Sequence, residues 1–476
     1  MRSKVVEGAI LALVTAFTAA AAPPPKATAV ASVDRHREEL VDLAAKVWEY
    51  AETALEETRS AALLADHAEA HGFRVERGVA GMPTAFVASY GEGRPVIGIL
   101  GEYDALPGIS QKAQPEREPV VPGGAGHGCG HNLFGAASLG AALAVKEQIE
   151  AGTLKGTVRF YGTPAEEAVG GKVYMVREGL FDDVDAVVVW HPDFVIRADT
   201  RSSQAMVDLR IEFQGKAAHA AYDPWNGRSA LDAVEVFLHA LNLMREHVRP
   251  SVRMHYTIPD GGGAPNVVPE TASVWCWLRD TTRKGVDDLL QRTRAMVQGA
   301  ALATGTAGSV TVQSGSYEML PSLAGARAMQ RNLEWLGPLK FDQAATELGK
   351  AIQIAAGVEP VGMHGEVLPF EEEPPAPEGG STDVADVSWV VPTIQVVVTT
   401  APAGVPWHAW PVVAASNTEI GFQGMTYAAK AMAATMVDLF QDPELLREMR
   451  EEHEVRTGGH RYRPFVGDGP PPVPGR

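Results

Sequence analysis

A glycine-rich segment near the middle of the first half of the chain holds three residues of the kind that bind metal ions. The run Gly-His-Gly-Cys-Gly-His-Asn spans residues 126–132 and puts His127, Cys129 and His131 at alternate positions. Histidine nitrogens and cysteine thiolates are ligands for zinc and other first-row metals. The intervening glycines let the backbone fold closely around an ion. Taken alone, the segment is equally compatible with a glycine-rich turn that happens to contain histidines.

Two adjacent carboxylates, Glu166 and Glu167, follow the apolar run 157–161. By itself such a pair is typical of a solvated turn. Beside a metal ion the pair can divide its work, because one carboxylate can ligate while the other takes a proton from water. Adjacent side chains point in different directions, so we expect only one of the two to be a ligand.

Polar residues also follow three other apolar runs that are typical of strands. The four runs are 96–100, 157–161, 186–190 and 394–399, and the polar residues after them include Asp104, Glu167, His191 and His408. Ligands of open α/β sheets bind outside the carboxyl ends of the strands. We therefore expect these residues to meet the 126–132 segment at one edge of a sheet, which favours a metal site.

The elements that must position these residues indicate an α/β fold. The apolar runs lack alternation, which is typical of strands in a mostly parallel sheet that is covered on both faces. Helical patterns separate them at about residues 40–48, 60–71, 132–149 and 172–178. The sequence therefore predicts an α/β catalytic domain.

The middle of the chain follows a different pattern. Residues 207–213 alternate between apolar and polar, which indicates a half-exposed strand. The predicted order of elements here is β-α-β-β-α-β, the split βαβ pattern of ferredoxin-like domains. We expect residues 205–316 to form such a domain, inserted between a first catalytic part at 32–204 and a second at 317–455.

The two ends of the chain differ from the rest. Arg2 and Lys4 precede an apolar run at 9–22, a pattern typical of a signal peptide and leader, which we place at residues 1–31. The apolar run has about 14 residues, whereas a membrane span needs ~20. We therefore expect export to the periplasm or outside the cell without a stable membrane anchor, a cytoplasmic protein being the alternative. Residues 456–476 are rich in glycine and proline and indicate an irregular tail.

Composition excludes several classes of protein. The 476 residues exceed one ordinary domain of ~100–200 residues. The formal net charge of −18 and the absence of a long basic run argue against nucleic-acid binding. The chain has two cysteines, Cys129 and Cys276, which are too few for a disulfide framework. Because Cys129 has no second cysteine near it in the sequence, thiol redox chemistry is not favoured.

Seven ordered motifs resemble those of the dinuclear metallo-amidohydrolases of the aminoacylase and carboxypeptidase family. They are HGCGHN, TPAEEAVGGK, WHP, GKAAHAA, PNVVPE, STDVADVSW and WHAW, and the similarity covers residues of about 34–440. Within that family the chain is most similar to the aminobenzoyl-glutamate hydrolase branch. The resemblance implies a two-metal catalytic domain and an inserted lid domain through which two copies form a homodimer.

The resemblance also implies roles for nine residues. The implied metal ligands are Cys129, His131, Glu167, His191 and His408, the implied general base is Glu166, and the implied substrate contacts are His219, Asn266 and Arg279. The cofactors would be two divalent ions, zinc or manganese, with cobalt as a substitute in vitro.

The chain departs from the family pattern at two positions. Many relatives have a metal-binding histidine two residues before Asp104, where this chain has Glu102, which we do not count as a ligand. Many also have aspartate where this chain has Asn132, which removes a negative charge. We expect His127 beside the site and not among the ligands.

The implied activity is hydrolysis of an amide bond between an acyl or aroyl group and an amino acid. Glu166 would be the general base, and His219 from the partner's lid would bind the oxyanion. A dipeptidase or carboxypeptidase of the same family is an alternative that the motifs do not separate. A binding protein without turnover is a further alternative, against which the intact Glu166 argues. Trp407, Trp410 and Tyr103 either line an aromatic acyl pocket or belong to the core.

Overall fold

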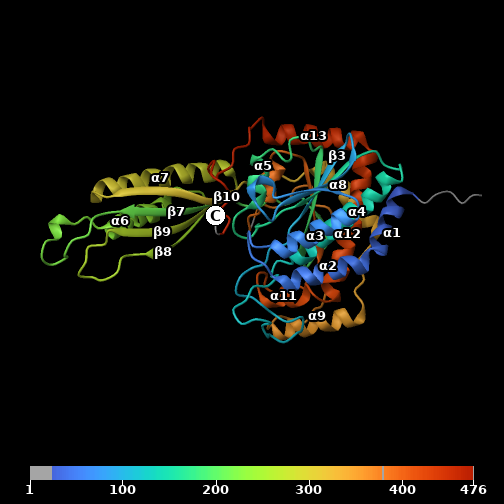
Figure 1. Cartoon of the computed structure of the whole chain (residues 1–476), viewed down its shortest axis with the longest axis horizontal. Coiled ribbons are helices and arrows are strands. Elements are labelled where there is room, and N and C mark those ends of the chain that lie inside the picture. The colour runs from blue at the N-terminus through green and yellow to red at the C-terminus, as the bar shows by residue number, and fades with distance from the viewer. Residues whose placement is uncertain (1–23, 378–379, 475–476) are drawn as a thin grey trace, which may run out of the picture.

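The computed structural model describes residues 24–377 and 380–474, which form two parts (Figure 1). The larger part is built on a seven-stranded sheet in the order β1-β2-β4-β3-β5-β11-β6. Its strands are β1 (Arg74–Arg77), β2 (Phe86–Glu92), β3 (Val96–Gly101), β4 (Gly156–Gly162), β5 (Ala186–Asp193), β6 (Arg197–Asp199) and β11 (Thr393–Thr399). The central strands β4, β3, β5 and β11 are parallel, whereas β1, β2 and β6 pair antiparallel with their neighbours. The predicted α/β class with a mostly parallel sheet is confirmed.

Helices enclose this sheet and bury its central strands. They are α1 (Pro25–Arg35), α2 (Arg37–Tyr50), α3 (Thr58–Ala70), α4 (His131–Glu150), α5 (Gly171–Arg177), α8 (Leu323–Leu336), α9 (Gln343–Ala355), α10 (Val384–Ser388), α11 (Trp410–Ala415), α12 (Glu419–Gln441) and α13 (Pro443–Thr457). Short 3-10 turns lie at Val79–Gly81, Pro224–Asn226 and Arg245–His247. Every residue of β3 is buried, as expected for a parallel strand with both faces covered.

The alanine-rich helix α4 is buried along most of its length and packs on β3, β4 and β5. A Cβ on Gly135 would lie 2.9 Å from the carbonyl oxygen of Glu102. Glycine is therefore required for the first turn of α4 to approach the residue that follows β3. This close packing fixes the loop before α4, which carries Cys129, against the carboxyl end of the sheet.

The smaller part, which we call the lid (residues 205–316), projects from the larger one (Figure 1). Its elements are β7 (Ala205–Gln214), α6 (Ala230–Met244), β8 (Arg253–Asp260), β9 (Thr271–Asp280), α7 (Arg283–Thr304) and β10 (Ala307–Ser316). The four strands form an antiparallel sheet in the order β10-β7-β9-β8, the ferredoxin-like arrangement that the element order predicted. The two helices cover one face of this sheet around a separate core. On the other face, Trp275, Trp277 and Arg279 of β9 are exposed or half-buried.

The N-terminal leader that the sequence predicts at residues 1–31 overlaps the fold. Residues 25–31 lie in α1, which packs against α4 and α12, and Ala29 and Val33 are fully buried. The folded part thus begins before residue 32, while the apolar run at 9–22 lies outside the described residues. Across residues 24–377 and 380–474, no helix combines the length and the apolar character that crossing a membrane requires.

The C-terminal tail after α13 is irregular but packs on the larger part. The hydroxyl of Tyr462 donates to Asp386 Oδ1 at 2.7 Å, and the hydroxyl of Tyr317 donates to the carbonyl of Arg463 at 2.6 Å. The tail therefore buries polar groups near the junction with the lid.

Candidate metal centre

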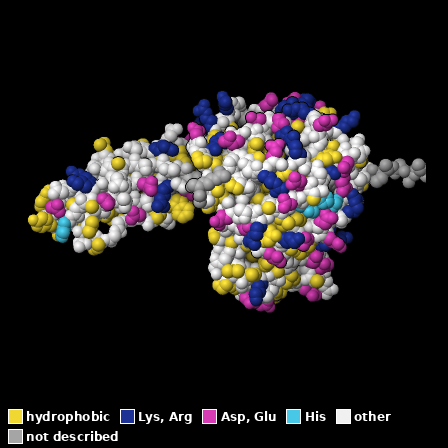
Figure 2. All heavy atoms as spheres, in the orientation of Figure 1, with side chains coloured by type: hydrophobic (Ala, Val, Ile, Leu, Met, Phe, Trp, Pro, Cys, Tyr) yellow, Lys and Arg dark blue, Asp and Glu magenta, His cyan; other side chains and the backbone are white. Residues whose placement is uncertain are grey.

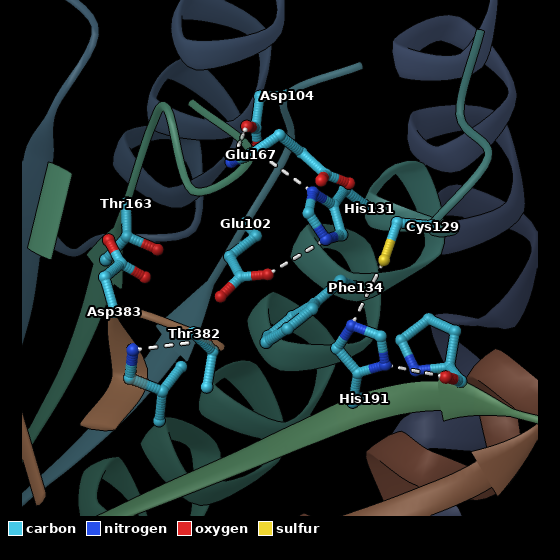
Figure 3. A network of polar contacts seen from close by, with 12 residues as sticks. Glu102, Asp104, Cys129, His131, Phe134, Thr163, Glu167, His191, Thr382 and Asp383 are labelled. Carbon is cyan, nitrogen blue, oxygen red and sulfur yellow. Dashed lines mark hydrogen bonds and ion pairs between the residues drawn. The ribbon is translucent and has the colours of Figure 1, made fainter. Parts of the chain in front are cut away.

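The carboxyl ends of the parallel strands bring the predicted polar residues together. Glu102 and Asp104 follow β3, Glu166 and Glu167 follow β4, and His191 lies in the last part of β5. Cys129 enters from the loop before α4, and His131 is the first residue of α4 (Figure 3). His408 comes from the loop after β11. The chain thus gathers thiol, imidazole and carboxylate groups at one edge of the sheet.

Cys129, His131 and His191 form a first group whose ligand atoms all lie within 4.8 Å of one another. The Sγ atom of Cys129 is 3.3 Å from Nε2 of His191. The Nδ1 atom of His191 donates to the carbonyl of Pro192 at 2.7 Å. Because that hydrogen bond places the proton on Nδ1, the lone pair of Nε2 faces the thiol, which is the orientation of a metal-ligating histidine.

Cys129, Glu167 and His408 form a second group of the same size. Nε2 of His408 is 3.5 Å from a carboxylate oxygen of Glu167. The other oxygen of Glu167 is buried and has no hydrogen-bond partner among residues 24–377 and 380–474. Cys129 belongs to both groups, so the two groups adjoin through its sulfur.

His131 lies between two buried carboxylates (Figure 3). Its Nδ1 atom is 2.9 Å from Asp104, and its Nε2 atom is 3.1 Å from Glu102. Burial disfavours the charged imidazole, but Cys129, Glu102 and Asp104 together raise the pKa of His131 well above its ordinary value. The other carboxylate oxygen of Asp104 accepts the backbone N–H of Glu167 at 2.9 Å, which holds Asp104 in place beside His131.

Glu102, His131 and Glu166 form a third group with ligand atoms within 4.8 Å. The sequence left Glu102 without a role, and the structure places it directly beside His131 and Glu166. Burial raises the pKa of Glu166 well above its ordinary value, and Glu102 and Glu167 add to this effect. Burial likewise raises the pKa of Glu167 to about 7.

This donor set fits divalent metal ions. Thiolate, imidazole and carboxylate are all ligands of zinc in proteins, and the carboxylates also suit manganese. The raised pKa values of Glu166 and Glu167 show buried acids that lack sufficient positive charge nearby. A divalent cation would supply that charge and would satisfy the unpartnered oxygen of Glu167.

Two residues of the site adopt a left-handed backbone that side chains rarely favour. Ala165 has φ of 62° and His408 has φ of 53°. The N–H of Ala165 donates to the buried carboxylate of Glu57 at 2.9 Å, and the N–H of His408 donates to the carbonyl of Gly128 at 3.0 Å. These bonds hold the strained backbone, which aims the side chains of Glu166 and His408.

A buried lysine, which the sequence did not identify as a site residue, pairs with two carboxylates beside the metal-ligand groups. Lys172, at the start of α5, has a fully buried ammonium 2.7 Å from Glu102 and 2.6 Å from Asp383. Burial opposes its charge, but Asp383 and Glu102 outweigh burial and raise the pKa of Lys172 above its ordinary value. Lys172 and Asp383 both lie in quoted family motifs, which was the available signal for them. Lys172 is a positioning residue, because it holds Glu102 beside His131.

A cavity of about 410 Å³ opens beside the metal-ligand groups, between the larger part and the lid. The larger part lines it with Glu166, Glu167 and His408, and the lid lines it with Trp277 and Arg279. Of the three predicted substrate contacts, the structure therefore brings only Arg279 to the site of its own chain.

His219 and Asn266 lie elsewhere. The Ala205 end of β7 adjoins the larger part, since Ser203 accepts the N–H of Met319 at 3.0 Å, and β7 runs from there to Gln214 at the far end of the lid. The segment after Gln214 carries His219, which forms a β-bridge with Val267 next to Asn266. These two residues are neighbours at the tip of the lid, away from the Cys129 groups.

The other candidates that the sequence suggested have structural roles. His127 is buried and its Nε2 donates to the carbonyl of Val47 at 3.0 Å. Tyr103 is fully buried in the main core, and Trp407 and Trp410 pack on a small cluster under α9 and α11. None of the three aromatic residues is among those that line the cavity beside Glu166.

Comparison with known proteins gives a consistent assignment. Residues 98–315 match the model of Peptidase family M20/M25/M40. The chain is 40% identical to one of the subunits of p-aminobenzoyl-glutamate hydrolase from Escherichia coli strain K12, over 90% of this chain and 95% of that protein. It is 29% identical to the Xaa-Arg dipeptidase of Homo sapiens, over 89% of this chain and 91% of that protein.

A solved structure from Bacillus subtilis shares the fold. It is described as a dinuclear metal-binding peptidase of the M20 family, and it superposes with a TM-score of 0.57 at 18% identity, covering 86% of this chain and 99% of that one. The family model, the relative that matches over nearly its whole length and the clustered ligands agree. The chain therefore belongs to peptidase family M20/M25/M40 and is a hydrolase of amide bonds.

Proposed function

We propose that this protein hydrolyses the amide bond between an acyl or aroyl group and an amino acid. The observation that carries the proposal is the cavity of about 410 Å³ beside the centre, which both Glu166 and Arg279 line. One small molecule in this cavity could therefore place its amide bond at Glu166 and its free carboxylate at Arg279, as an N-acyl amino acid would. The E. coli relative is named for such an N-aroyl amino acid, p-aminobenzoyl-glutamate.

Family membership implies divalent metal ions, and we assign their ligands as Cys129, His131, Glu167, His191 and His408. Cys129 belongs to two of the ligand groups, so its thiolate would help to hold an ion in either group. We propose zinc or manganese as the native metal, with cobalt as a substitute in vitro. When bound, such ions lower the pKa of water to roughly 7 and polarise a carbonyl.

Glu166 is assigned as the general base. Its carboxylate lies within 4.8 Å of the ligand atoms of His131 and Glu102 and also lines the cavity. Glu166 takes a proton from the attacking water and later delivers it to the nitrogen of the leaving amine. Burial, together with Glu102 and Glu167, raises the pKa of Glu166 above that of an ordinary carboxyl group, which favours proton uptake from water.

Arg279 is assigned as the partner of the substrate carboxylate. Its guanidinium is half-buried, lies 5.1 Å from the ring centre of Trp277 and makes no ion pair with the residues that the structure describes. Burial lowers its pKa, which reflects the cost of a cation without a counter-ion. A carboxylate from the substrate removes that cost.

We further propose that two lids pair and that His219 and Asn266 enter the site of the partner subunit. Nδ1 of His219 accepts the N–H groups of Ala221 at 3.2 Å and Tyr222 at 3.1 Å. The proton is thereby placed on Nε2, which is the donor that an oxyanion needs. Tyr222 is 80% exposed in the single chain, as expected of a surface that another subunit covers.

Complementation tests the shared site. His219→Ala and Glu166→Gln should each keep metal and lose turnover. Mixing the two variants under subunit exchange should give hybrid dimers with one intact site, and thus about a quarter of wild-type activity. Mixing either variant with itself is the matched control. A fully active monomer, or no recovery after exchange is proven by mass labelling, would reject the shared site.

A substrate panel tests the reaction itself. The enzyme, supplied separately with zinc, manganese or cobalt, is assayed on N-aroyl amino acids, N-acyl amino acids and dipeptides. We expect hydrolysis of N-acyl or N-aroyl amino acids to give the highest kcat/KM. A preference for dipeptides would instead favour the dipeptidase alternative, which the Homo sapiens relative's name supports.

The N-terminal pattern supports export to the periplasm or outside the cell. A cleavage that preserves α1 must fall before Pro25, because α1 packs into the core. N-terminal sequencing of protein from its native cell should find a start between about Ala21 and Pro25. Recovery of Met1 would overturn the export proposal.

A further inference from the structure

A second group of potential metal ligands lies on the surface of the larger part, apart from the cavity. It joins the beginning of α2 to the end of α3 and consists of His36, Glu39, His67 and His71. Figure 2 shows histidine side chains gathered on this face of the larger part. The four side chains, which we call the His36 cluster, have no place in the proposed reaction.

All three histidines converge on one oxygen of Glu39. The distances to that oxygen are 3.3 Å from Nδ1 of His36 and 3.4 Å from Nε2 of His71. Nε2 of His67 is 3.7 Å from the same oxygen. Zinc binds nitrogen and oxygen at about 2.0–2.2 Å, so neighbouring ligands of a tetrahedral ion lie about 3.3 Å apart. The ligand atoms of His36, Glu39 and His71 all lie within 4.8 Å of one another, and His67 adjoins this group through Glu39. A shift of the side chains would bring all four to the spacing of a tetrahedral zinc site.

His36 is oriented as a metal ligand. Its Nε2 lies 2.8 Å from a carboxylate oxygen of Glu147 and donates to it. Glu147 is itself held at 2.6 Å by Ser32 and at 2.6 Å by Arg35. The lone pair of Nδ1 in a neutral His36 then faces the carboxylate of Glu39, which is repulsive unless a proton or a metal ion lies between them. A histidine whose second nitrogen donates to a carboxylate is the usual arrangement around zinc.

His67 supplies an independent observation. Its Nε2 is buried and lacks a hydrogen-bond partner within the part of the chain that the structure describes. His67 lies in the last turn of α3 and His71 is its C-cap, four residues later, close to the spacing by which a helix presents two histidines to one zinc ion. Burial, followed by the neighbouring His71, lowers the pKa of His67 to about 4, so its imidazole is neutral and able to ligate.

We propose that His36, Glu39, His67 and His71 bind one zinc ion that links α2 to α3. Glu39 is half exposed, which gives the ion a path from solution. The far end of α2 supports the catalytic loops, because Val47 accepts from His127 and Glu52 accepts the N–H of Ala105. The zinc ion therefore stabilises the scaffold of the larger part and takes no part in the reaction.

Zinc stoichiometry tests the proposal on protein that carries no histidine tag. Wild type, His71→Gln and Glu39→Gln are dialysed against the same zinc buffer and analysed for metal per chain. His247→Gln is the matched control, because His247 is an exposed histidine in the lid. We expect wild type and the control to hold one zinc more per chain than the two cluster variants, with equal hydrolytic activity in all four.

A second readout separates ligation from a merely structural effect. Glu147→Gln should weaken zinc binding at this site about 10–100-fold and leave the sites at Cys129 unchanged. Zinc should also raise the unfolding temperature of wild type more than that of His71→Gln. Equal zinc content in wild type and both cluster variants would overturn the proposal. The difference between variants does not depend on how many ions the Cys129 groups hold, so failure here is distinguishable from failure of the proposed function.

Discussion

Replacing Lys172 by methionine should destabilise the metal-free protein by about 3–5 kcal/mol at pH 7, because it leaves buried carboxylates without their cation. The ammonium of Lys172 is fully buried between Glu102 and Asp383, at 2.7 Å and 2.6 Å. Methionine fills a similar volume and removes only the charge and its hydrogen bonds. One carboxylate can respond by taking up a proton. For an ordinary aspartate pKa of ~3.9, that costs about 4 kcal/mol at pH 7.

The same reasoning predicts how the loss of unfolding free energy in Lys172→Met depends on pH. Burial raises the pKa of Asp383 and Lys172 opposes this effect, so the pKa of Asp383 rises further in the variant. Protonation then favours the folded state, and the deficit shrinks as pH falls towards 4. Urea unfolding of chelator-treated wild type and Lys172→Met at pH 7 and pH 5 measures both effects. The double variant Lys172→Met/Asp383→Asn is the control and should lose less than the single variant. A loss below ~1 kcal/mol at pH 7, or a deficit that grows at pH 5, would refute the reasoning.

Three further predictions concern the metal centre and the cavity. Cys129→Ala should weaken metal binding at both ligand groups that contain Cys129, whereas His408→Ala should weaken it at one. Elemental analysis that finds full metal content in Cys129→Ala would contradict the assignment of Cys129 to both groups. Arg279→Ala should raise KM at least about tenfold for substrates with a free carboxylate, as expected for loss of a charged hydrogen bond; an equal effect on the corresponding carboxamides would show that Arg279 acts otherwise. Zinc affinity should fall as pH drops below about 7, because a proton then competes for Glu167; titrations at pH 8 and pH 6 with equal affinities would count against Glu167 as a ligand.

Much of the fold follows from local sequence patterns. The apolar runs at β3, β4, β5 and β11 have no alternation because their strands are buried on both faces, and this made the parallel centre predictable. The edge strands β1 and β6 were not predicted. They are short and partly exposed, so neither carries a strong apolar signal.

The candidate site was predictable in its residue types but not in its supporting contacts. Four strand ends must meet in a parallel sheet, which is why Cys129, His191 and His408 were expected together. Lys172 and Asp383 are 211 residues apart in the chain, and only tertiary packing brings them into contact. The expected leader at residues 1–31 overlaps α1, which the sequence did not predict because this helix has little periodic apolar character, although it packs against α4 and α12.

The central claim is that Glu166 acts as the general base beside a metal centre that does not depend on it. The direct measurement is kcat of Glu166→Gln, with metal content determined on the same sample. We predict full metal occupancy and unchanged substrate binding, with kcat lowered by about 10²–10⁴-fold because the proton has no other acceptor in place. A variant with full metal and near wild-type kcat would contradict the account.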